Sequence, residues 1–579
     1  MTQSVSSEDK YESIVRLAKK RGFFWPSYEI YGGMAGFYDL GPLGVILKNN
    51  IVNLWREYFV IKHLDMVVEI ETPIITPKIV FEASGHLQHF TDPIVECLRC
   101  GRKYRADQLI EDTLKMKVEG LGVNELTRIV RENNLTCPAC GGPLSDVKEF
   151  NLLFQTYVGP YTQNIAYLRP EAAQGMFVNF KNVYTVMREK LPLGIAQIGK
   201  VARNEISPRQ GMFRLREFTI MEVEFFYDPE DPSEPPFDRF NGKLRILTAE
   251  ARAKGLEEVV EVRADEAYEE GLVKSPWLAY WMGVANEFVK ALGVLSNEIL
   301  FEEKLPHERA HYATQTFDQL VKVSRWGWIE VSGHAYRSDY DLSRHIKYSG
   351  QDLRVFKRYD KPVIKYKERL VINKAILGRM YKSELPKILK AIEDLGIDKI
   401  KELLSSSGSD LVIAGYSIPK DALKIVREEV KVMGEHVVPH VAEPSFGAER
   451  LVLVVLDKAY DVEKDGRVVL RLPPRIAPIK VAVFPLVSRE PLTKIAMEIY
   501  MKFLKHGITA IYDDSGSIGR RYARADEIGV PFAVTVDYDT PSDGTVTIRF
   551  RDTREQIRVK VSDVINEIKS RIEYSSSSS

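Results

Sequence analysis

The chain has 579 residues, which at roughly 150 residues per domain predicts about three to four domains. Hydrophobic residues make up 45% and charged residues 28%, as is typical of a folded globular protein. The 81 basic residues equal the 81 acidic ones, so the overall charge neither favours nor excludes a nucleic-acid partner.

The first 91 residues combine helices with a glycine-rich turn and one strand. Residues 9–22 predict a short basic helix, and the glycine-rich segment 31–44 precedes a second helix over about 43–63. Residues 65–76 alternate like a strand, and Pro73 within them predicts a position at the edge of a sheet.

The next part of the chain predicts an insertion followed by strands. The insertion over 92–150 carries all four cysteines. Strands are expected at 151–158 and 195–206, with a helix at 171–189 between them. Residues 213–226 predict a further long strand.

An acidic, proline-rich boundary at 228–236 precedes an expected helical insertion over 237–320. Ser275 and Pro276 are the residue types that cap and begin a helix. The apolar residues that follow at helical spacing are expected to form core rather than a binding surface: Trp277, Tyr280, Trp281, Val284 and Phe288.

The last third predicts another insertion and a separate domain. The insertion over 346–432 begins as a basic segment and contains a flexible serine-rich loop at 405–409. Prolines at 473, 474 and 478 mark a linker. Strands and helices alternate beyond it, which predicts a small α/β domain with a mostly parallel sheet.

Two arginine-bearing segments carry the chemistry of the chain. Arg203-Asn-Glu205 and the strand after it predict a hairpin with charged groups on one face, although a solvated sheet would show the same alternation. In the second segment, 443–450, Arg450 falls in the first turns of a helix, where free amide groups favour an anion. A planar guanidinium group binds phosphate through two parallel hydrogen bonds. The chain has neither glycine-rich phosphate-binding motif, GxxxxGK[ST] or GxGxxG after a strand, so we expect these arginines to bind the phosphates of any nucleotide.

The cysteines predict a metal site. Cys97, Cys100, Cys137 and Cys140 form two CxxC pairs 36 residues apart, which favours a structural zinc ribbon over reduced free thiols. The long interval predicts a helical excursion between the pairs. Metal-binding thiols indicate a reducing compartment, and no apolar run approaches the roughly 20 residues of a membrane helix. The polar first residues do not resemble a signal peptide, so we expect a cytoplasmic protein with no membrane partner.

Together these segments resemble a known family. Arg203-x-Glu205 with Phe218, and Gly447-x-x-Arg450, resemble motifs 2 and 3 of class II aminoacyl-tRNA synthetases, and Pro73 fits the dimer-forming motif 1. Beyond the class, the chain resembles glycyl-tRNA synthetases of the homodimeric archaeal and eukaryotic type. The stretches that carry this similarity are 36–44, 82–86, 169–175, 203–209, 328–330, 337 with 340–342, and 443–447.

The resemblance implies an α+β catalytic domain with an antiparallel sheet, which carries insertions and is followed by an α/β anticodon-binding domain. The catalytic pieces are expected at 1–91, 151–236, 321–345 and 433–472, the insertions at 92–150, 237–320 and 346–432, and the anticodon-binding domain at 473–579. A homodimer is expected.

The resemblance also implies the reaction: ATP-dependent attachment of glycine to tRNA(Gly) through a glycyl-adenylate. Arg203 and Arg450 would hold the α- and γ-phosphates of ATP, and Glu330 would be the ligand of Mg²⁺. The ATP site would comprise Arg203, Asn204, Glu205, Arg214, Leu215, Glu330, Val331 and Arg450. The glycine site would comprise Glu171, Glu222, Glu443, Pro444 and Ser445.

Three glutamates around one ammonium imply that they also fill the space of a side chain, so that every larger amino acid clashes. Two alternatives remain open: a class II synthetase for another small amino acid, and a non-catalytic synthetase-like protein that binds nucleic acid.

Arg520, Arg521 and Arg524 in the last domain are expected to meet tRNA phosphates, and His86 is expected to be structural. A basic cluster beside the first cysteine pair either touches the acceptor stem or is simply solvated: Arg99, Arg102, Lys103 and Arg105.

Overall fold

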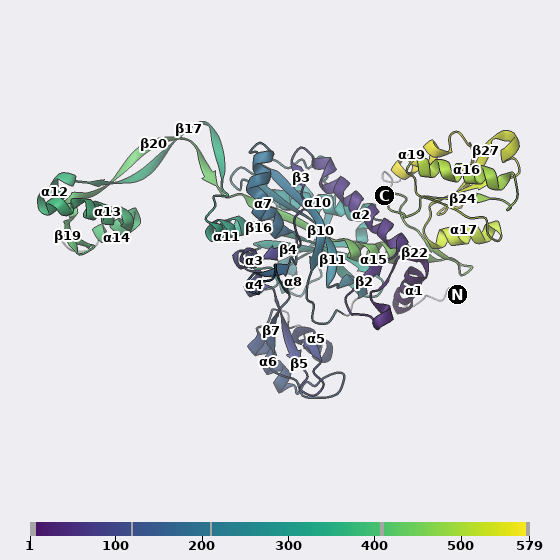
Figure 1. Cartoon of the computed structure of the whole chain (residues 1–579), viewed down its shortest axis with the longest axis horizontal. Coiled ribbons are helices and arrows are strands. Elements are labelled where there is room, and N and C mark those ends of the chain that lie inside the picture. The colour runs from purple at the N-terminus through teal and green to yellow at the C-terminus, as the bar shows by residue number, and fades with distance from the viewer. Residues whose placement is uncertain (1–6, 117, 119, 209–210, 406–409, 575–579) are drawn as a thin grey trace. The chain divides into compact units, whose positions relative to one another are not determined.

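The computed structural model describes residues 7–574 apart from 117, 119, 209–210 and 406–409 (Figure 1). Arg209, most of the serine-rich loop and the terminal serines at 575–579 therefore lie outside the described residues. The chain divides into two compact units, one of residues 1–353 with 438–579 and one of residues 354–437.

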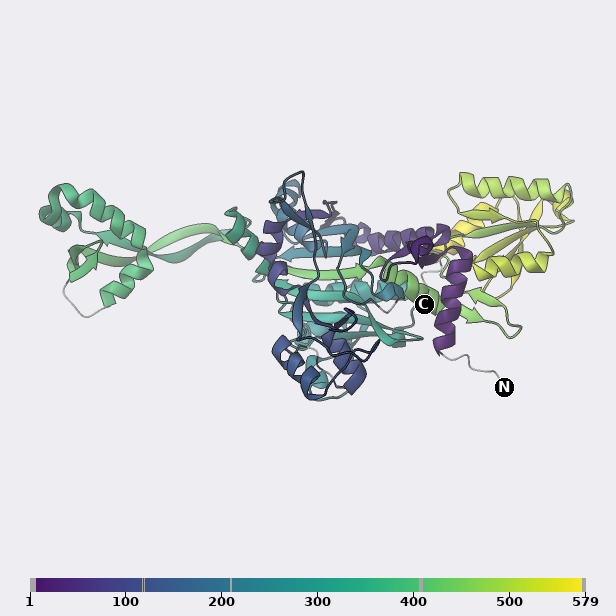
Figure 2. The ribbon, with the colours of Figure 1, turned by 60° about the horizontal axis from the view of Figure 1, so that its bottom comes forward.

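A nine-stranded sheet forms the centre of the larger unit, in the order β13-β12-β14-β15-β16-β21-β11-β10-β3 (Figures 1 and 2). Its strands are β3 (Val67–Glu69), β10 (Leu193–Ala202), β11 (Glu217–Tyr227), β12 (Lys243–Leu247), β13 (Val260–Arg263), β14 (Ile299–Glu303), β15 (Gln315–Val323), β16 (Gly327–Ser338) and β21 (His440–Gly447). All neighbours from β14 to β10 are antiparallel, which confirms the expected α+β class. The short strand β3 lies at the edge of the sheet as expected, but it ends at Glu69, so Pro73 lies outside it and the predicted strand 65–76 is not continuous.

The two faces of β11 pack against different parts of the structure. Met221, Val223 and Phe225 point into the main apolar core. That core also contains apolar residues of α2 (Pro42–Phe59), α10 (Pro276–Ala291) and α15 (Ala448–Ala459). Because side chains alternate along a strand, the even-numbered residues of β11 point to the opposite face. There Phe226 contacts Phe177 and Phe180 of α7 (Ala173–Val186).

The segment 237–320 is not the separate helical insertion that the sequence suggested. It adds β12, β13 and β14 to the central sheet and contributes α10 to the core. The strands are only four or five residues long and pair across gaps in the sequence, so their local pattern is weak. The expected helix is present, because Ser275 caps α10 and its aromatic residues are fully buried.

Two predicted strands also end earlier or begin later than expected. β10 stops at Ala202 and β11 begins at Glu217, after a short 3-10 turn at Gly211–Phe213. Arg203, Glu205, Arg214 and Arg216 therefore lie in the connection between the strands and not on one strand face. Pro208 and Gly211 in this connection oppose continued pairing.

The cysteine-bearing segment folds around its own small core. It consists of β5 (Thr91–Glu96), β6 (Lys103–Arg105) and β7 (Lys148–Asn151), with α5 (Ala106–Leu114) and α6 (Val123–Glu132) between the cysteine pairs. These two helices are the excursion that the long CxxC interval predicted.

Smaller elements complete the larger unit. They are α1 (Ser7–Arg21), β1 (Phe24–Pro26), β2 (Tyr38–Leu40), β4 (Ile75–Pro77), α3 (Lys78–Ser84), α4 (His86–His89), β8 (Phe154–Tyr157), β9 (Ile165–Leu168), α8 (Ala249–Ala253), α9 (Ala264–Glu269), α11 (Tyr340–Ser349), β22 (Tyr460–Val462) and β23 (Val468–Leu470).

The C-terminal part has a five-stranded sheet in the order β25-β24-β26-β27-β28. The elements are β24 (Val481–Pro485), α16 (Leu492–Lys505), β25 (Ala510–Tyr512), α17 (Ile518–Glu527), β26 (Phe532–Val536), α18 (Thr540–Asp543), β27 (Thr545–Phe550), β28 (Gln556–Lys560) and α19 (Val564–Tyr574). Only β25, β24 and β26 are parallel to one another, whereas β27 and β28 are added antiparallel. The expectation of a mostly parallel sheet thus holds for the first half of this domain.

The second unit is a long two-stranded ribbon that carries a small globular module (Figure 1). β17 (Val355–Ile372) pairs with β20 (Leu423–Val437), and the module comprises α12 (Lys374–Tyr381), α13 (Leu385–Leu395), α14 (Ile397–Ser405), β18 (Asp410–Ile413) and β19 (Tyr416–Pro419). The insertion therefore starts after α11, which belongs to the larger unit, and not at residue 346.

The burial of α10 gives a test of the role of segment 237–320 in the main core. Phe288 is fully buried against Tyr58, Phe59 and Phe446. Phe288→Ala should therefore lower the free energy of unfolding of the main transition by about 3–5 kcal/mol in a denaturant titration. Leu295→Ala, at a position that is 65% exposed, is the matched control and should leave the midpoint nearly unchanged. An unchanged main transition for Phe288→Ala would mean that the segment folds separately.

Candidate functional site

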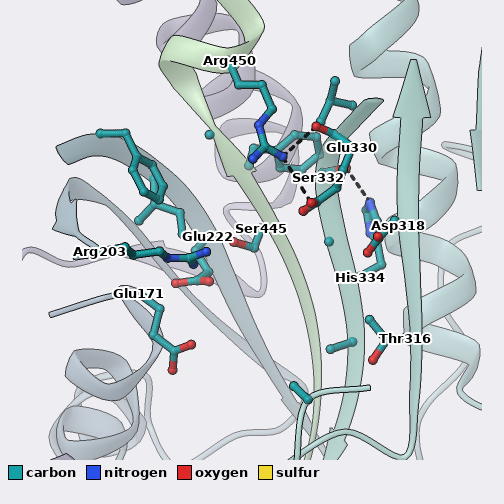
Figure 3. Close-up of a pocket in the computed structure, with 18 of the residues that line it drawn as sticks. Glu171, Arg203, Glu222, Thr316, Asp318, Glu330, Ser332, His334, Ser445 and Arg450 are labelled. Carbon is teal, nitrogen blue, oxygen red and sulfur yellow. Dashed lines mark hydrogen bonds and ion pairs between the residues drawn. The ribbon is translucent and has the colours of Figure 1, made fainter. Parts of the chain in front are cut away.

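A cavity of about 430 Å³ lies on the even-numbered face of β11 (Figure 3). Its walls come from β11, β15, β16 and β21, from the connection between β10 and β11, and from the start of α15. The predicted residues that line it are Glu171, Arg203, Glu205, Arg214, Leu215, Glu222, Glu330, Val331, Glu443, Ser445 and Arg450. The structure thus brings together most of the site that the sequence predicted.

Two predicted residues are not part of the wall. Pro444 is buried and points away from the cavity, because it alternates with Glu443 and Ser445 on β21. Asn204 is held by its backbone amide, which donates to the carbonyl oxygen of Leu152 at 2.7 Å. Neither side chain lines the cavity.

Arg203 enters the cavity from the end of β10. Its Nε donates to the carbonyl oxygen of Pro170 at 3.0 Å, and its guanidinium lies 5.3 Å from the ring centre of Phe218. These contacts fix the fork so that it extends toward Glu222 and Ser445 (Figure 3). Arg216, by contrast, donates to the carbonyl oxygens of Glu205 and Ala35, so it holds the connecting loop together and does not line the cavity.

Arg450 enters from the first turn of α15 on another side of the cavity. It donates to the carbonyl oxygens of Glu330 at 2.7 Å and Phe213 at 3.2 Å, and it lies 3.3 Å from the Glu330 carboxylate. The register of β16 against β15 shifts at Val331, a bulge that re-aims neighbouring side chains. Partial loss of hydration in the cavity would raise the pKa of Glu330, whose side chain is still 48% exposed, but Arg450, Lys304 and Arg203 lower it below the usual value. Glu330 is therefore an anionic group beside the two arginines.

The floor of the cavity is a row of residues paired across four strands. Glu222 opposes Ser445, Ser445 opposes Gly333, and Gly333 opposes Asp318. A Cβ atom at Gly333 would meet no atom within 4 Å, so the absent side chain keeps the middle of the row open. Directly paired residues of neighbouring strands point to the same face of the sheet. The row therefore places the carboxyl groups of Glu222 and Asp318 on opposite sides of the open position at Gly333.

The carboxylates of this floor differ in their ionisation. Glu171 lies 3.3 Å from His86 and 3.5 Å from Arg337; burial opposes its charge, but these neighbours lower its pKa below the usual value. Burial, Glu443 and Glu171 raise the pKa of Glu222 well above it, although Glu222 accepts a hydrogen bond from the amide of Ala172 at 2.8 Å. The pocket therefore combines a carboxyl group whose surroundings favour ionisation, Glu171, with one whose surroundings oppose it, Glu222. His86, expected to be structural, directly contacts one of them.

Several residues of the site had no role in the sequence analysis. Arg337 is fully buried and joins Glu443 and Asp341 at 2.8 Å each, above the ring of Tyr312. Asp318 pairs with Lys304 at 2.8 Å; burial and Glu330 raise its pKa to about 7. Tyr312, Asp318 and Lys304 come from the segment that was interpreted as an insertion, which explains why they were missed.

The four cysteines form a second candidate site. Their sulfur atoms all lie within 4.8 Å of one another, with Cys97 3.5 Å from Cys140 and Cys100 3.7 Å from Cys137. Tetrahedral zinc with Zn–S bonds of about 2.3 Å requires sulfur atoms roughly 3.8 Å apart. The donor set fits a closed, four-thiolate metal site with no position left for a substrate.

The arginines of α17 do not all match the expectation. Arg521 is 2% exposed and donates to the carbonyl oxygens of Asp514 and Gly516, so its expected contact with phosphate is wrong. Arg524 pairs with Asp513 at 2.8 Å, whereas Arg520 is exposed. Sequence showed the charges of these residues but not their burial.

Comparisons with known proteins support the same interpretation. Residues 161–388 match the family model "tRNA synthetase class II core domain (G, H, P, S and T)", and residues 480–571 match "Anticodon binding domain". The "Glycine--tRNA ligase" of Aeropyrum pernix is 56% identical over 567 residues, 97% of each chain. That of Pyrococcus abyssi is 49% identical over 97% of this chain and 98% of its own, and that of Methanocaldococcus jannaschii is 44% identical over 98% and 99%.

The buried position of Arg337 predicts a large and pH-dependent effect of its removal. Arg337→Leu leaves Glu171, Glu443 and Asp341 without their shared cation and should cost about 3–5 kcal/mol of stability at neutral pH. Burial raises the pKa of Glu171 and Arg337 lowers it, so without Arg337 the carboxyl group takes up a proton at mildly acid pH, which relieves part of the loss in the variant. Urea titrations at pH 5 and pH 8 should therefore show the larger deficit at pH 8.

Arg239→Leu is the control for this measurement. Arg239 pairs with Asp65 at 3.5 Å, and both side chains are largely exposed. Its loss should cost less than about 1 kcal/mol at both pH values. Equal effects of the two substitutions would contradict the buried ion cluster.

Proposed function

This chain belongs to the glycine–tRNA ligase family of class II synthetases, and from that premise we propose which residues perform each part of its reaction. The enzyme attaches glycine to tRNA at the expense of ATP, through a glycyl-adenylate. One observation carries the residue assignments: a single cavity is lined by side chains from separate parts of the chain, namely Arg203, Arg450, Glu171, Glu222 and Glu443. A non-catalytic protein would have no need of this set.

The first step requires alignment and charge neutralisation rather than a protein nucleophile. The glycine carboxylate attacks the α-phosphate, and pyrophosphate leaves. We assign Arg203 to the α-phosphate and Arg450 to the γ-phosphate, since both guanidinium groups are already fixed by backbone carbonyls. Glu205, Arg214 and Leu215 would frame the adenosine, with Val331 along the nucleotide. Asn204 would act only through its backbone.

Magnesium is a cofactor of class II synthetases, and the carboxylates of this cavity suit it. Glu330 and Asp318 point into the same space from adjacent strands, and hard cations prefer oxygen ligands (Figure 3). When bound, the ion shields negative charge on the leaving pyrophosphate. Lys304, which pairs with Asp318, would balance that carboxylate in the absence of the ion.

Glycine would bind at the acid end of the cavity. Glu171, Glu222 and Glu443 with Ser445 offer acceptors for the ammonium, and Arg337 holds two of these carboxylates in place. Pro444 would contribute only by fixing the strand. A bound amino acid with a side chain would collide with these groups, and a collision has no upper limit in energy.

Three further assignments extend the proposal. The four cysteines would hold zinc in a structural role, since a closed thiolate set leaves no open position. Edge strand β3 and Pro73 would form a homodimer contact, as motif 1 implies. A cytoplasmic location stays a prediction; among the described residues, no helix combines the length and hydropathy needed to cross a bilayer.

The glycine assignment is tested by ATP–pyrophosphate exchange with each of the twenty amino acids. The protein should exchange with glycine alone. Glu222→Ala should raise the KM for glycine by about tenfold or more and admit alanine, because it removes an acceptor and opens space in the pocket. Glu217→Ala, on the same strand but half-exposed, is the control. Unchanged exchange with glycine in the Glu222 variant would refute the assignment.

The zinc assignment is tested by metal analysis of the purified protein. About one zinc per chain is expected, and Cys137→Ser should lose it and loosen residues 91–151. Ala139→Ser, between two cysteines, is the control and should retain the metal. Because the site is closed, glycine-dependent exchange should persist in the Cys137 variant. Activity that falls in proportion to zinc content would show instead that the metal is catalytic.

A further inference from the structure

Glu224 lies beneath the glycine pocket and has no counterpart in the mechanism above. It follows Glu222 by two residues on β11, so both side chains point to the same face. Glu224 is fully buried, and among the described residues neither of its carboxyl oxygens has a hydrogen-bond partner. One oxygen from each of Glu222, Glu224 and Glu443 lies within 4.8 Å of the other two. Glu224 does not line the cavity, so it acts through its neighbours.

The charges around Glu224 do not balance if every carboxyl group is ionised. The groups that face this region from β11, β16, β21, α4, α7, α11 and neighbouring loops are Glu171, Glu222, Glu224, Glu443, Asp341, Arg337, Arg169, Arg203, His86, His345, Gln174 and Tyr312. The guanidinium groups of Arg337, Arg169 and Arg203 would offset only three of the five carboxylates. Isolated buried charges are so costly that groups take up protons instead.

The positions of the carboxyl groups indicate where protons are held. Glu171 and Glu443 lie against Arg337, and Asp341 forms two hydrogen bonds with it. In the part of the chain that the structure describes, Glu222 and Glu224 form no ion pair, although Arg169 and Arg203 lie on the side of Glu222. Burial and the nearby Glu443 raise the pKa of both Glu222 and Glu224 well above the usual value, in agreement with this geometry.

We propose that a proton is held between Glu224 and the Glu222–Glu443 pair in the glycine-free protein, and that it leaves to solvent when the ammonium of glycine enters. This inference rests on the proposed function. The O–H bond breaks with its electron pair remaining on the carboxylate, and the ammonium replaces the proton, so the net charge of the buried cluster is unchanged. Glycine binding is then an exchange of one cation for another. Glu224 is a positioning residue: its carboxyl group adds to the cluster a negative charge that either the proton or the ammonium of glycine balances.

Proton release has a defined consequence for affinity. A ligand that displaces a proton binds more tightly as the pH rises, by up to about tenfold per pH unit below the apparent pKa of the cluster. The amino group of glycine remains an ammonium throughout the neutral range, so this dependence comes from the protein. A ligand of the same shape without an ammonium should release no proton.

The proposal is tested by calorimetry with a non-reactive glycyl-sulfamoyl-adenosine and with its acetyl counterpart, which lacks the amino group. Titrations at pH 7 in phosphate and in Tris give the number of protons released from the difference in buffer ionisation heat. The glycyl compound should release close to one proton from the wild-type protein and the acetyl compound nearly none. Equal proton release by the two compounds would overturn the proposal without reliance on any variant.

Glu224→Gln tests the residue itself. It should retain the melting temperature of the wild type within a few degrees, lose most of the proton release, and raise the KM for glycine about tenfold at pH 8 with the KM for ATP unchanged. Glu217→Gln on the same strand should behave as wild type. Undiminished proton release by the Glu224 variant would overturn the assignment to Glu224.

The two proposals can fail separately. Absence of glycine-dependent pyrophosphate exchange in the wild type would remove the proposed function. Normal exchange without proton release would remove only the inference about Glu224.

Discussion

The register of β11 is the constraint on which the rest of the structure depends. Its odd-numbered residues, including Met221 and Phe225, are buried in the main apolar core, and its even-numbered residues Glu222 and Glu224 form the acid floor. A shift by one residue would place carboxyl groups in the core and aromatic rings in the pocket. The same burial that stabilises the sheet therefore fixes the position of the acid floor of the cavity. Pairing with β10 on one side and β21 on the other reinforces this register.

Arg337 fixes the same carboxyl-rich region by ion pairs, as the register of β11 fixes it by burial. Its fully buried guanidinium contacts carboxylates from α11, from β21 and from the loop before α7, so it connects three elements around one charge. The ring of Tyr312 covers it at 3.6 Å, which keeps water away. Such a cluster contributes little net stability, because desolvation offsets the attraction. Its value lies in holding several carboxyl groups at fixed positions before glycine arrives.

Local sequence motifs identified most of the residues that line the cavity, but not how distant segments of the chain build the sheet around it. The arginines and glutamates of the cavity stand in short local motifs, so their residue types could be read directly, as for Arg203, Glu222 and Arg450. Lys304 and Asp318 reach the cavity only through pairing of β14 with β15, which no local pattern reveals. Burial was equally hidden, so Arg521 was mistaken for a phosphate contact although it is enclosed by backbone carbonyls.

An acid wall suits the smallest amino acid for a reason beyond size. An apolar wall of the same volume would exclude larger residues, but it would also leave the ammonium without acceptors. Carboxyl groups supply these acceptors, and a methyl group placed against them would both collide and deprive them of hydrogen-bond partners. Their mutual repulsion is the difficulty, since several carboxylates cannot remain ionised together in a buried space. Arg337 offsets part of that charge, and in the proposed scheme a proton near Glu224 offsets more until the ammonium of glycine takes its place. The substrate would then complete the charge balance that the empty pocket keeps with a proton.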